Sequence, residues 1–169
     1  SMYAMFSGAR KFNQPINTSS DGSKWNTSNV TNMALMLQEA VSFTYPIGDW
    51  NTSKVTNMYR MLWNANQFNH SLANFNLTSI NNSTSESMVD MLMSSGLDCD
   101  NYAASLIGWA QNYSNKTIRL GALNKKYSPT AQSARNALTA GGWIITDAGV
   151  EYNCACTKPA LDLSFPITH

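Results

Sequence analysis

The sequence predicts an α/β repeat protein, in which short coils stack on one another and an irregular cap closes the stack. Three observations predict it. The string at residues 25–33 recurs at residues 50–58, which gives a period of 25 residues. Within each period, an apolar stripe at helical spacing alternates with a short apolar segment. From about Asp98 the period ends but the alternation continues. Such periods are typical of stacked repeats, because one repeat cannot bury its apolar face without a neighbour.

The repeat is in register over three copies and part of a fourth. A third copy starts at Phe75, where Phe replaces Trp, and resumes at Met88 after an insertion of five residues. A partial copy begins at Met2, and six extra residues separate it from Trp25. We expect both insertions to be surface loops. The equivalent positions of the partial copy and the next one are Met2 and Met33, Met5 and Met36, Ala9 and Ala40, Phe12 and Phe43, and Ile16 and Ile47.

Each repeat divides into two predicted elements. Apolar residues at relative positions 0, 3, 6, 7 and 10 predict one short helix per coil, over residues 55–65 in the best copy. Thr52 or Ser53 can cap its start. Residues 47–50 and 72–75 are too short for helices and are predicted to be strands. Equivalent strands would pair in parallel, and the connections should make the stack right-handed.

The chain divides into three parts by this pattern. Residues 2–97 form the repeat solenoid of about four coils. Residues 98–150 form a capping segment of the same domain, with helices predicted around Leu106 and after Pro129, and strands at residues 117–120 and 143–146. Gly141 and Gly142 should end the second helix. Residues 151–169 have two prolines and no period, and they indicate a linker or a docked tail.

The repeat motif resembles that of a known family. Trp-Asn-Thr-Ser-x-Val-Thr-Asn-Met, followed by Ala-x-x-Phe-x-x-x-Ile-Gly-Asp-Trp, is similar to the repeats of BspA-like bacterial surface proteins. That family was first catalogued as a mycoplasma domain of unknown function and lies near the leucine-rich repeats. The resemblance implies a leucine-rich-repeat-like solenoid in an extracellular adhesion or ligand-binding protein. Its partner would be a protein or a carbohydrate on another cell or matrix.

Composition excludes several classes of partner. Charged residues make up 12% of the chain, about half of the ~25% that is usual, and the net charge is +1. No basic footprint therefore indicates nucleic acid. No apolar stretch of ~18 residues is present, so we expect no membrane insertion by this fragment. Ser1 and Met2 look like a cloning remnant, and we expect the fragment to come from a larger secreted or anchored cell-surface protein.

The sequence does not indicate catalysis. It lacks a nucleophile elbow, a phosphate-binding Gly-rich loop and a His-Glu-x-x-His motif, so we expect no enzyme, no catalytic residues and no cofactor. His70 has no Cys or second His in its coil, and we expect no metal site. A disulfide of Cys99 with Cys154 or with Cys156 is one interpretation, and three unpaired thiols are the other.

Most repeated polar and apolar columns have a structural interpretation. The Met stripe and the column of Trp25, Trp50 and Phe75 are interpreted as core. The column of Asn26, Asn51 and Asn76 is interpreted as a ladder that satisfies turn backbone. Asn-x-Ser/Thr sequons, Asn112 among them, are interpreted as a consequence of an Asn-rich composition. The candidates left for ligand binding lie within the predicted strands (Asp49 and Asn74), beside them (Tyr45 and His70), or away from the apolar stripe (Tyr59 and Trp63).

Three functions follow in order of preference. The first is a non-catalytic recognition or adhesion module that binds a protein or glycan partner. The second is a structural spacer or stalk without its own ligand, which a uniformly polar surface would favour. The third is an enzyme of unrecognised type.

Overall fold

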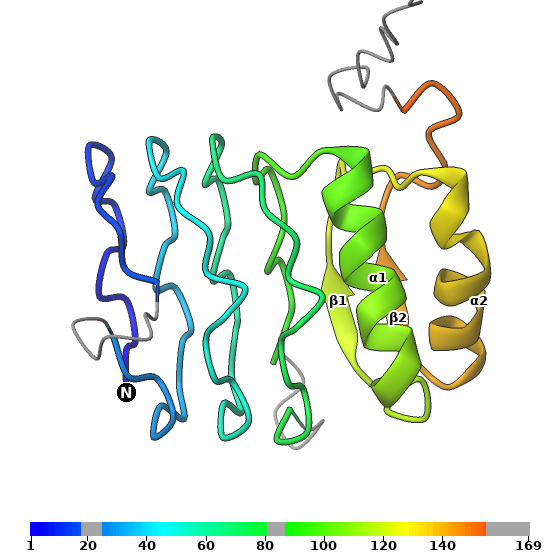
Figure 1. Ribbon diagram of the computed structural model, residues 1–169, viewed down its shortest axis with the longest axis horizontal. Helices are drawn as coiled ribbons and strands as arrows, with labels where there is room; N and C mark the ends of the chain where they lie inside the picture. The colour runs from blue at the N-terminus through cyan, green and yellow to red at the C-terminus, as the bar shows by residue number, and fades with distance from the viewer. Residues whose placement is uncertain (18–24, 81–86, 155–169) are drawn as a thin grey trace, which may run out of the picture.

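The structure is a computed structural model, and it describes residues 1–17, 25–80 and 87–154. Both predicted insertions lie mainly outside the described residues, as do Cys156 and all but the first four residues of the predicted tail 151–169. In the described part, successive segments of the chain lie side by side as stacked coils, and two helices and a small sheet follow them (Figure 1).

One backbone conformation recurs at residues 2–9, 33–40, 58–65 and 88–95, and we call each of these segments a turn ribbon. In the third turn ribbon, Met61 N donates to Met58 O at 3.1 Å and Ala65 N donates to Leu62 O at 3.1 Å. Arg60 and Asn64 have positive φ angles of 50° and 59°. Each ribbon is therefore a chain of overlapping tight turns rather than a helix or a strand.

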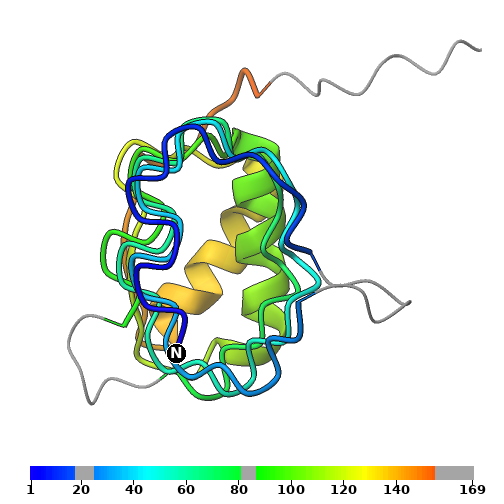
Figure 2. The same ribbon diagram turned by 90° about the vertical axis from the view of Figure 1, so that its left-hand side faces the viewer.

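Within the turn ribbons, the hydrogen bonds that join one ribbon to the next run in one direction, whereas at the ribbon ends Thr56 N donates back to Thr31 O at 2.8 Å and Gly96 N donates back to Ala65 O at 2.9 Å. Leu35 N donates to Tyr59 O at 2.8 Å, and Leu37 N donates to Met61 O at 3.0 Å. Leu62 N in turn donates to Met91 O at 3.0 Å, in the fourth ribbon. Alternate N–H groups thus point along the stack to the next ribbon, and the remaining ones close turns within their own ribbon. Viewed end-on, the zigzags of the ribbons superpose on one side of the stack (Figure 2).

The helix predicted over residues 55–65 is wrong, although the residues that predicted it are buried. Val55, Met58 and Met61 are completely shielded from solvent, yet this segment is a series of turns. Turns closed between residues i and i+3 bring every third residue to one face, much as a helix does, so the apolar spacing does not distinguish them. The positive φ at every fourth position of a ribbon and the acceptors offered by the next ribbon favour the turns.

The strands predicted at residues 47–50 and 72–75 are also wrong. Both segments are tight turns, closed by Trp50 N donating to Ile47 O at 3.1 Å and by Phe75 N donating to Leu72 O at 3.0 Å. The parallel pairing between coils occurs instead in and beside the turn ribbons, where Asn32 forms a bridge with Asn57. Apolar residues are buried in both arrangements, so short apolar segments did not identify the paired edge.

The C-terminal elements lie where the sequence predicts helices and strands. They are α1 (Cys99–Tyr113), β1 (Arg119–Gly121), the 3₁₀ helix η1 (Pro129–Ala131), α2 (Gln132–Ala140) and β2 (Ile144–Thr146). Strands β1 and β2 are parallel, with Leu120 opposite Ile145. A bridge between Met88 and Leu120 makes β1 the continuation of the turn ribbons. Helix α1 continues the opposite side of the stack (Figures 1 and 2).

One apolar core runs through the coils into the cap. The Phe12, Phe43 and Phe68 rings stack in a column with centroid separations of 5.8 and 6.1 Å. Trp50 is buried and its Nε1 donates to Ile16 O at 2.9 Å. A disulfide joins Cys99, at the start of α1, to Cys154. Among the residues described, no helix combines the length and the apolar character needed to cross a membrane.

A candidate binding cleft between α1 and residues 73–75

Helix α1 is held against the preceding coil by side chains that bond to that coil's backbone. Trp109 Nε1 donates to Leu72 O at 3.0 Å, and Ser105 Oγ accepts from Leu72 N at 2.9 Å. Gly108 faces Ala73, and a Cβ at Gly108 would lie 2.6 Å from the Ala73 Cβ. A glycine in mid-helix weakens the helix, but here it permits the close approach of backbone to backbone.

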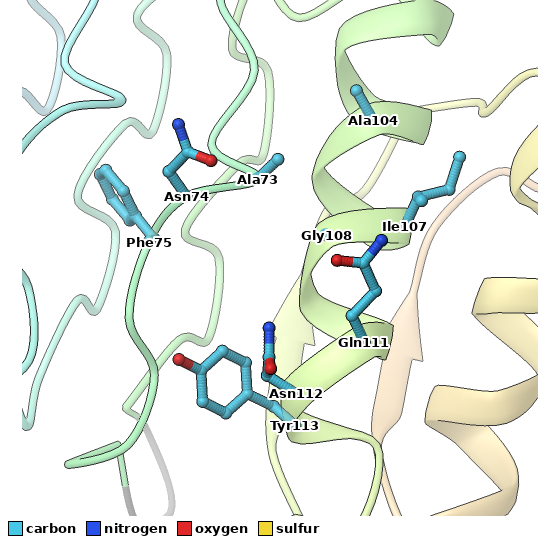
Figure 3. Close-up of a pocket in the computed structure, with 9 residues that line it drawn as sticks. All are labelled: Ala73, Asn74, Phe75, Ala104, Ile107, Gly108, Gln111, Asn112 and Tyr113. Carbon is cyan, nitrogen blue, oxygen red and sulfur yellow. The ribbon is translucent and has the colours of Figure 1, made fainter.

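A cleft of about 540 Å³ opens beside this contact, within the size range usual for small-ligand sites. One wall is the turn at residues 73–75, and the other is the outward face of α1 (Figure 3). The lining residues are Ala73, Asn74, Phe75, Ala104, Ile107, Gly108, Gln111, Asn112 and Tyr113.

The cleft presents four polar side chains that have no hydrogen-bond partner in the part of the chain that the structure describes. Asn74 comes from one wall, and Gln111, Asn112 and Tyr113 come from the last turn of α1 (Figure 3). Asn74, Gln111 and Asn112 are exposed and Tyr113 is half-buried. Within residues 1–17, 25–80 and 87–154, none of these four side chains forms a hydrogen bond. Their amide and hydroxyl groups are therefore available to a ligand.

These amides differ from the repeat asparagines. The Oδ1 atoms of Asn26, Asn51 and Asn76 accept from the N–H groups two residues further on, at 3.0, 3.1 and 2.9 Å. The Asn column predicted to satisfy turn backbone has this role. Most repeat amides are thus committed to turns, whereas Asn74 and Asn112 are not.

The cleft carries no charge of its own, because its nine lining residues are all neutral. The nearest cation along the chain from Tyr113 is Lys116, and its ammonium group is engaged elsewhere. Lys116 Nζ donates to Thr78 O at 2.6 Å and to Ile80 O at 2.8 Å, and burial lowers the pKa of this lysine. The lysine therefore anchors the chain after α1 to the preceding coil.

The repeat segment is recognised by comparison with protein families. The family described as "Mycoplasma protein of unknown function, DUF285" matches residues 1–98. The chain belongs to this family. The DUF285 segment includes every turn ribbon and the Asn74 wall of the cleft, and α1 begins where the match ends. No curated protein and no solved structure matches the chain.

The structure places the binding residues predicted within the DUF285 segment at different sites. Asn74 lines the cleft, whereas the equivalent Asp49, one period earlier, is exposed outside it. The half-buried ring of Tyr45 lies 6.3 Å from Phe43. His70 packs edge-on against Phe68 with centroids 5.7 Å apart, and its Nε2 lies 2.6 Å from Thr44 O.

Tyr59 and Trp63 lie on the third turn ribbon, on the other side of the stack. The guanidinium of Arg60 lies over both rings, 4.9 Å from the Tyr59 centroid and 5.7 Å from the Trp63 centroid. Arg60 also pairs with Asp90 at 3.0 Å. These two aromatic residues form a half-buried cluster with Arg60 and do not contribute to the cleft.

The sequence did not predict the α1 wall of the cleft. Gln111, Asn112 and Tyr113 follow an apolar helix pattern, and their one motif, the sequon at Asn112-Tyr113-Ser114, does not relate them to Asn74. The signal that could have found them is Gly108, a glycine within a strong helix pattern, which indicates close packing on that face.

A cluster elsewhere in the cap has the residue types of a metal site. Single ligand atoms of Cys99, Asp100 and Cys154 lie within 4.8 Å of one another. Both sulfurs belong to the disulfide, however, and thiolates are the form that binds a metal. The cluster is therefore a covalent link between α1 and the segment after β2.

Proposed function

We propose that this chain is a non-catalytic recognition module of a BspA-like extracellular surface protein, and that it binds an uncharged glycan in the cleft beside α1. A single observation carries the proposal: four polar side chains that form no hydrogen bond to another described residue line a neutral cleft from two structural elements.

The chemistry of the lining favours a sugar over a charged ligand. Each amide offers both N–H donors and an oxygen acceptor, and the Tyr113 hydroxyl does both as well. Sugar hydroxyl groups also donate and accept, so each can be paired in more than one way. A carboxylate or an ammonium would lose water in this cleft without gaining an opposite charge. The Tyr113 ring and Ile107 add apolar surface for the C–H groups of a sugar ring.

The proposed setting is a right-handed, leucine-rich-repeat-like solenoid with a C-terminal cap. The ladder between ribbons one period apart supports it, because equivalent residues of neighbouring repeats are bonded in parallel. The Cys99–Cys154 disulfide supports an extracellular location, since such bonds persist in oxidising compartments.

The test is a glycan array probed with the disulfide-bonded chain, followed by titration calorimetry on any sugar retained. Asn74→Ala and Gln111→Ala should each weaken binding at least tenfold. Gln67→Ala is the matched control, because Gln67 is an exposed amide outside the cleft, and it should bind like the unmodified chain. Equal affinity in all three variants would place the site elsewhere. A silent array together with a silent host-protein array would favour the spacer function instead.

A further inference from the structure

The cleft beside α1 changes in chemistry along its length. Ala104, Gly108 and Gln111 line it from α1, and their spacing of three or four residues places them on one face of the helix. With a rise of about 1.5 Å per residue, Ala104 and Gln111 are about 10 Å apart along the helix axis. The end of the cleft toward the start of α1 therefore has different lining residues from the end at its last turn (Figure 3).

The end of the cleft toward the start of α1 is apolar. Ala104 and Ile107 line it from the helix, and Ala73 lines it from the facing turn (Figure 3). All three side chains are half-buried, and none of them has a polar atom. A hydroxyl or a charged group placed against them would lose water without gaining a partner. This end of the cleft therefore favours an apolar group of the ligand.

The rest of the lining offers hydrogen bonds. The carboxamides of Asn74, Gln111 and Asn112 and the hydroxyl of Tyr113 both donate and accept. An acetamido group on a sugar ring fits such a divided cleft, because its methyl is apolar while its N–H donates and its C=O accepts. The hydroxyl groups on the remainder of the ring can then pair with the carboxamides.

We propose that the ligand of the cleft is an N-acetylated amino sugar, held with its acetyl methyl against Ala73 and Ala104 and its hydroxyl groups at Asn74 and Gln111. This inference rests on the proposed function and narrows its ligand class. A plain hexose would place a hydroxyl against the apolar end. A free amino sugar or a uronic acid would bring a charge to a cleft whose nine lining residues are all neutral.

An ammonium group would find no opposite charge in the lining. Along α1, the acidic residue nearest to Ala104 is Asp100, four residues before it. Asp100 is not a lining residue of the cleft. Its Oδ1 lies 3.3 Å from the Sγ of Cys154, at the disulfide. We therefore expect the acetylated sugar to bind in preference to its free amine.

The test is a two-dimensional NMR titration of the disulfide-bonded chain with the methyl glycosides of N-acetylglucosamine, glucose and glucosamine. These three sugars differ only in the group on carbon 2. The acetylated sugar should bind at least tenfold more tightly than the other two, and the largest shifts should include the amides of Ala104 and Gly108. The matching galactose series is a second arm, because the lining does not fix the configuration at carbon 4.

Ala104→Asp changes the apolar end without touching the carboxamides. A carboxylate there opposes the acetyl methyl and attracts an ammonium group, so the acetylated sugar should bind at least tenfold more weakly and glucosamine more tightly. The matched control is Ala137→Asp, an exposed position of α2 outside the cleft. It should bind all three sugars like the unmodified chain.

Several results would overturn this inference, and they differ in what they leave of the proposed function. Equal affinity for N-acetylglucosamine and glucose, with both weakened by Asn74→Ala, would refute the acetyl preference and leave the glycan site standing. Tightest binding of glucosamine would refute it too and would indicate pairing with Asp100. Unchanged binding of the acetylated sugar in folded Ala104→Asp would place the acetyl group elsewhere. No binding of any sugar in either series would refute the inference, and a silent glycan array as well would refute the proposed function with it.

Discussion

The methionine column offers a quantitative test of the stack, because it places one residue type both at the end and in the interior. Met61 is 0% exposed and Met5 is 49% exposed, at equivalent positions of their ribbons. Burying a Met side chain is worth about 1.5–3 kcal/mol, and a cavity in a closed core raises the total cost of Met→Ala to about 2–5 kcal/mol. For Met61→Ala we expect a loss of about 3 kcal/mol.

Met5→Ala should cost much less. About half of this side chain is already in water, so the transfer contribution is about 1 kcal/mol, and a site open to solvent leaves no closed cavity. The assay is urea unfolding followed by circular dichroism with the disulfide intact. With a slope of about 2 kcal/mol per M, the two variants should differ by about 1 M in midpoint. Equal shifts for both, at an unchanged slope, would show that Met61 is not enclosed between coils.

Three further predictions concern the cap. Replacing Cys99 and Cys154 together by Ser should lower the free energy of unfolding by about 2–4 kcal/mol, measured by urea titration, since the bond closes a loop of 55 residues; an unchanged midpoint would contradict this. Burial, followed by a nearby aspartate, raises the pKa of Tyr102 well above 10.0, so its contribution to stability is complete below pH 10 and is lost as the pH rises further. The urea midpoint should therefore fall less steeply between about pH 9.5 and 11.5 in Tyr102→Phe than in the unmodified chain. If both midpoints fall equally steeply, Tyr102 is not the cause of the loss of stability. A Cβ on Gly121 would overlap the backbone of Asp90, so Gly121→Ala should cost about 1–3 kcal/mol or more, and a thermal midpoint within one degree of the unmodified chain would refute the close contact.

Burial was easier to predict than backbone conformation. The stripe of Met58, Met61 and Leu62 was predicted to be buried, and its burial is confirmed. The helix assigned to it was wrong, because spacing by three and four residues is common to a helix and to a chain of i to i+3 turns. What decides between them is the set of acceptors on the neighbouring ribbon, which no local pattern records.

Of the two walls of the cleft, the sequence predicted one and not the other. Asn74 was a candidate because it lies, like Asp49, between the apolar residues of a predicted strand, and the exposed strand face of leucine-rich solenoids commonly binds partners. Gln111 and Asn112 were not candidates for this site, since their position opposite Asn74 depends on how α1 docks. That docking requires Gly108 against Ala73 and the bonds from Trp109 and Ser105 to Leu72. These are contacts between segments more than thirty residues apart.

By itself, the sequence determined the period, the residues that face the interior and the place where the repeat gives way to other helices and strands. These features depend on which side chains avoid water, and that preference is a property of each residue type. Only the tertiary structure decided that the coils are turn ribbons bonded to their neighbours, and that amides from two elements lie beside α1. Backbone groups are alike in every residue, so their partners are chosen only when neighbouring segments are brought together.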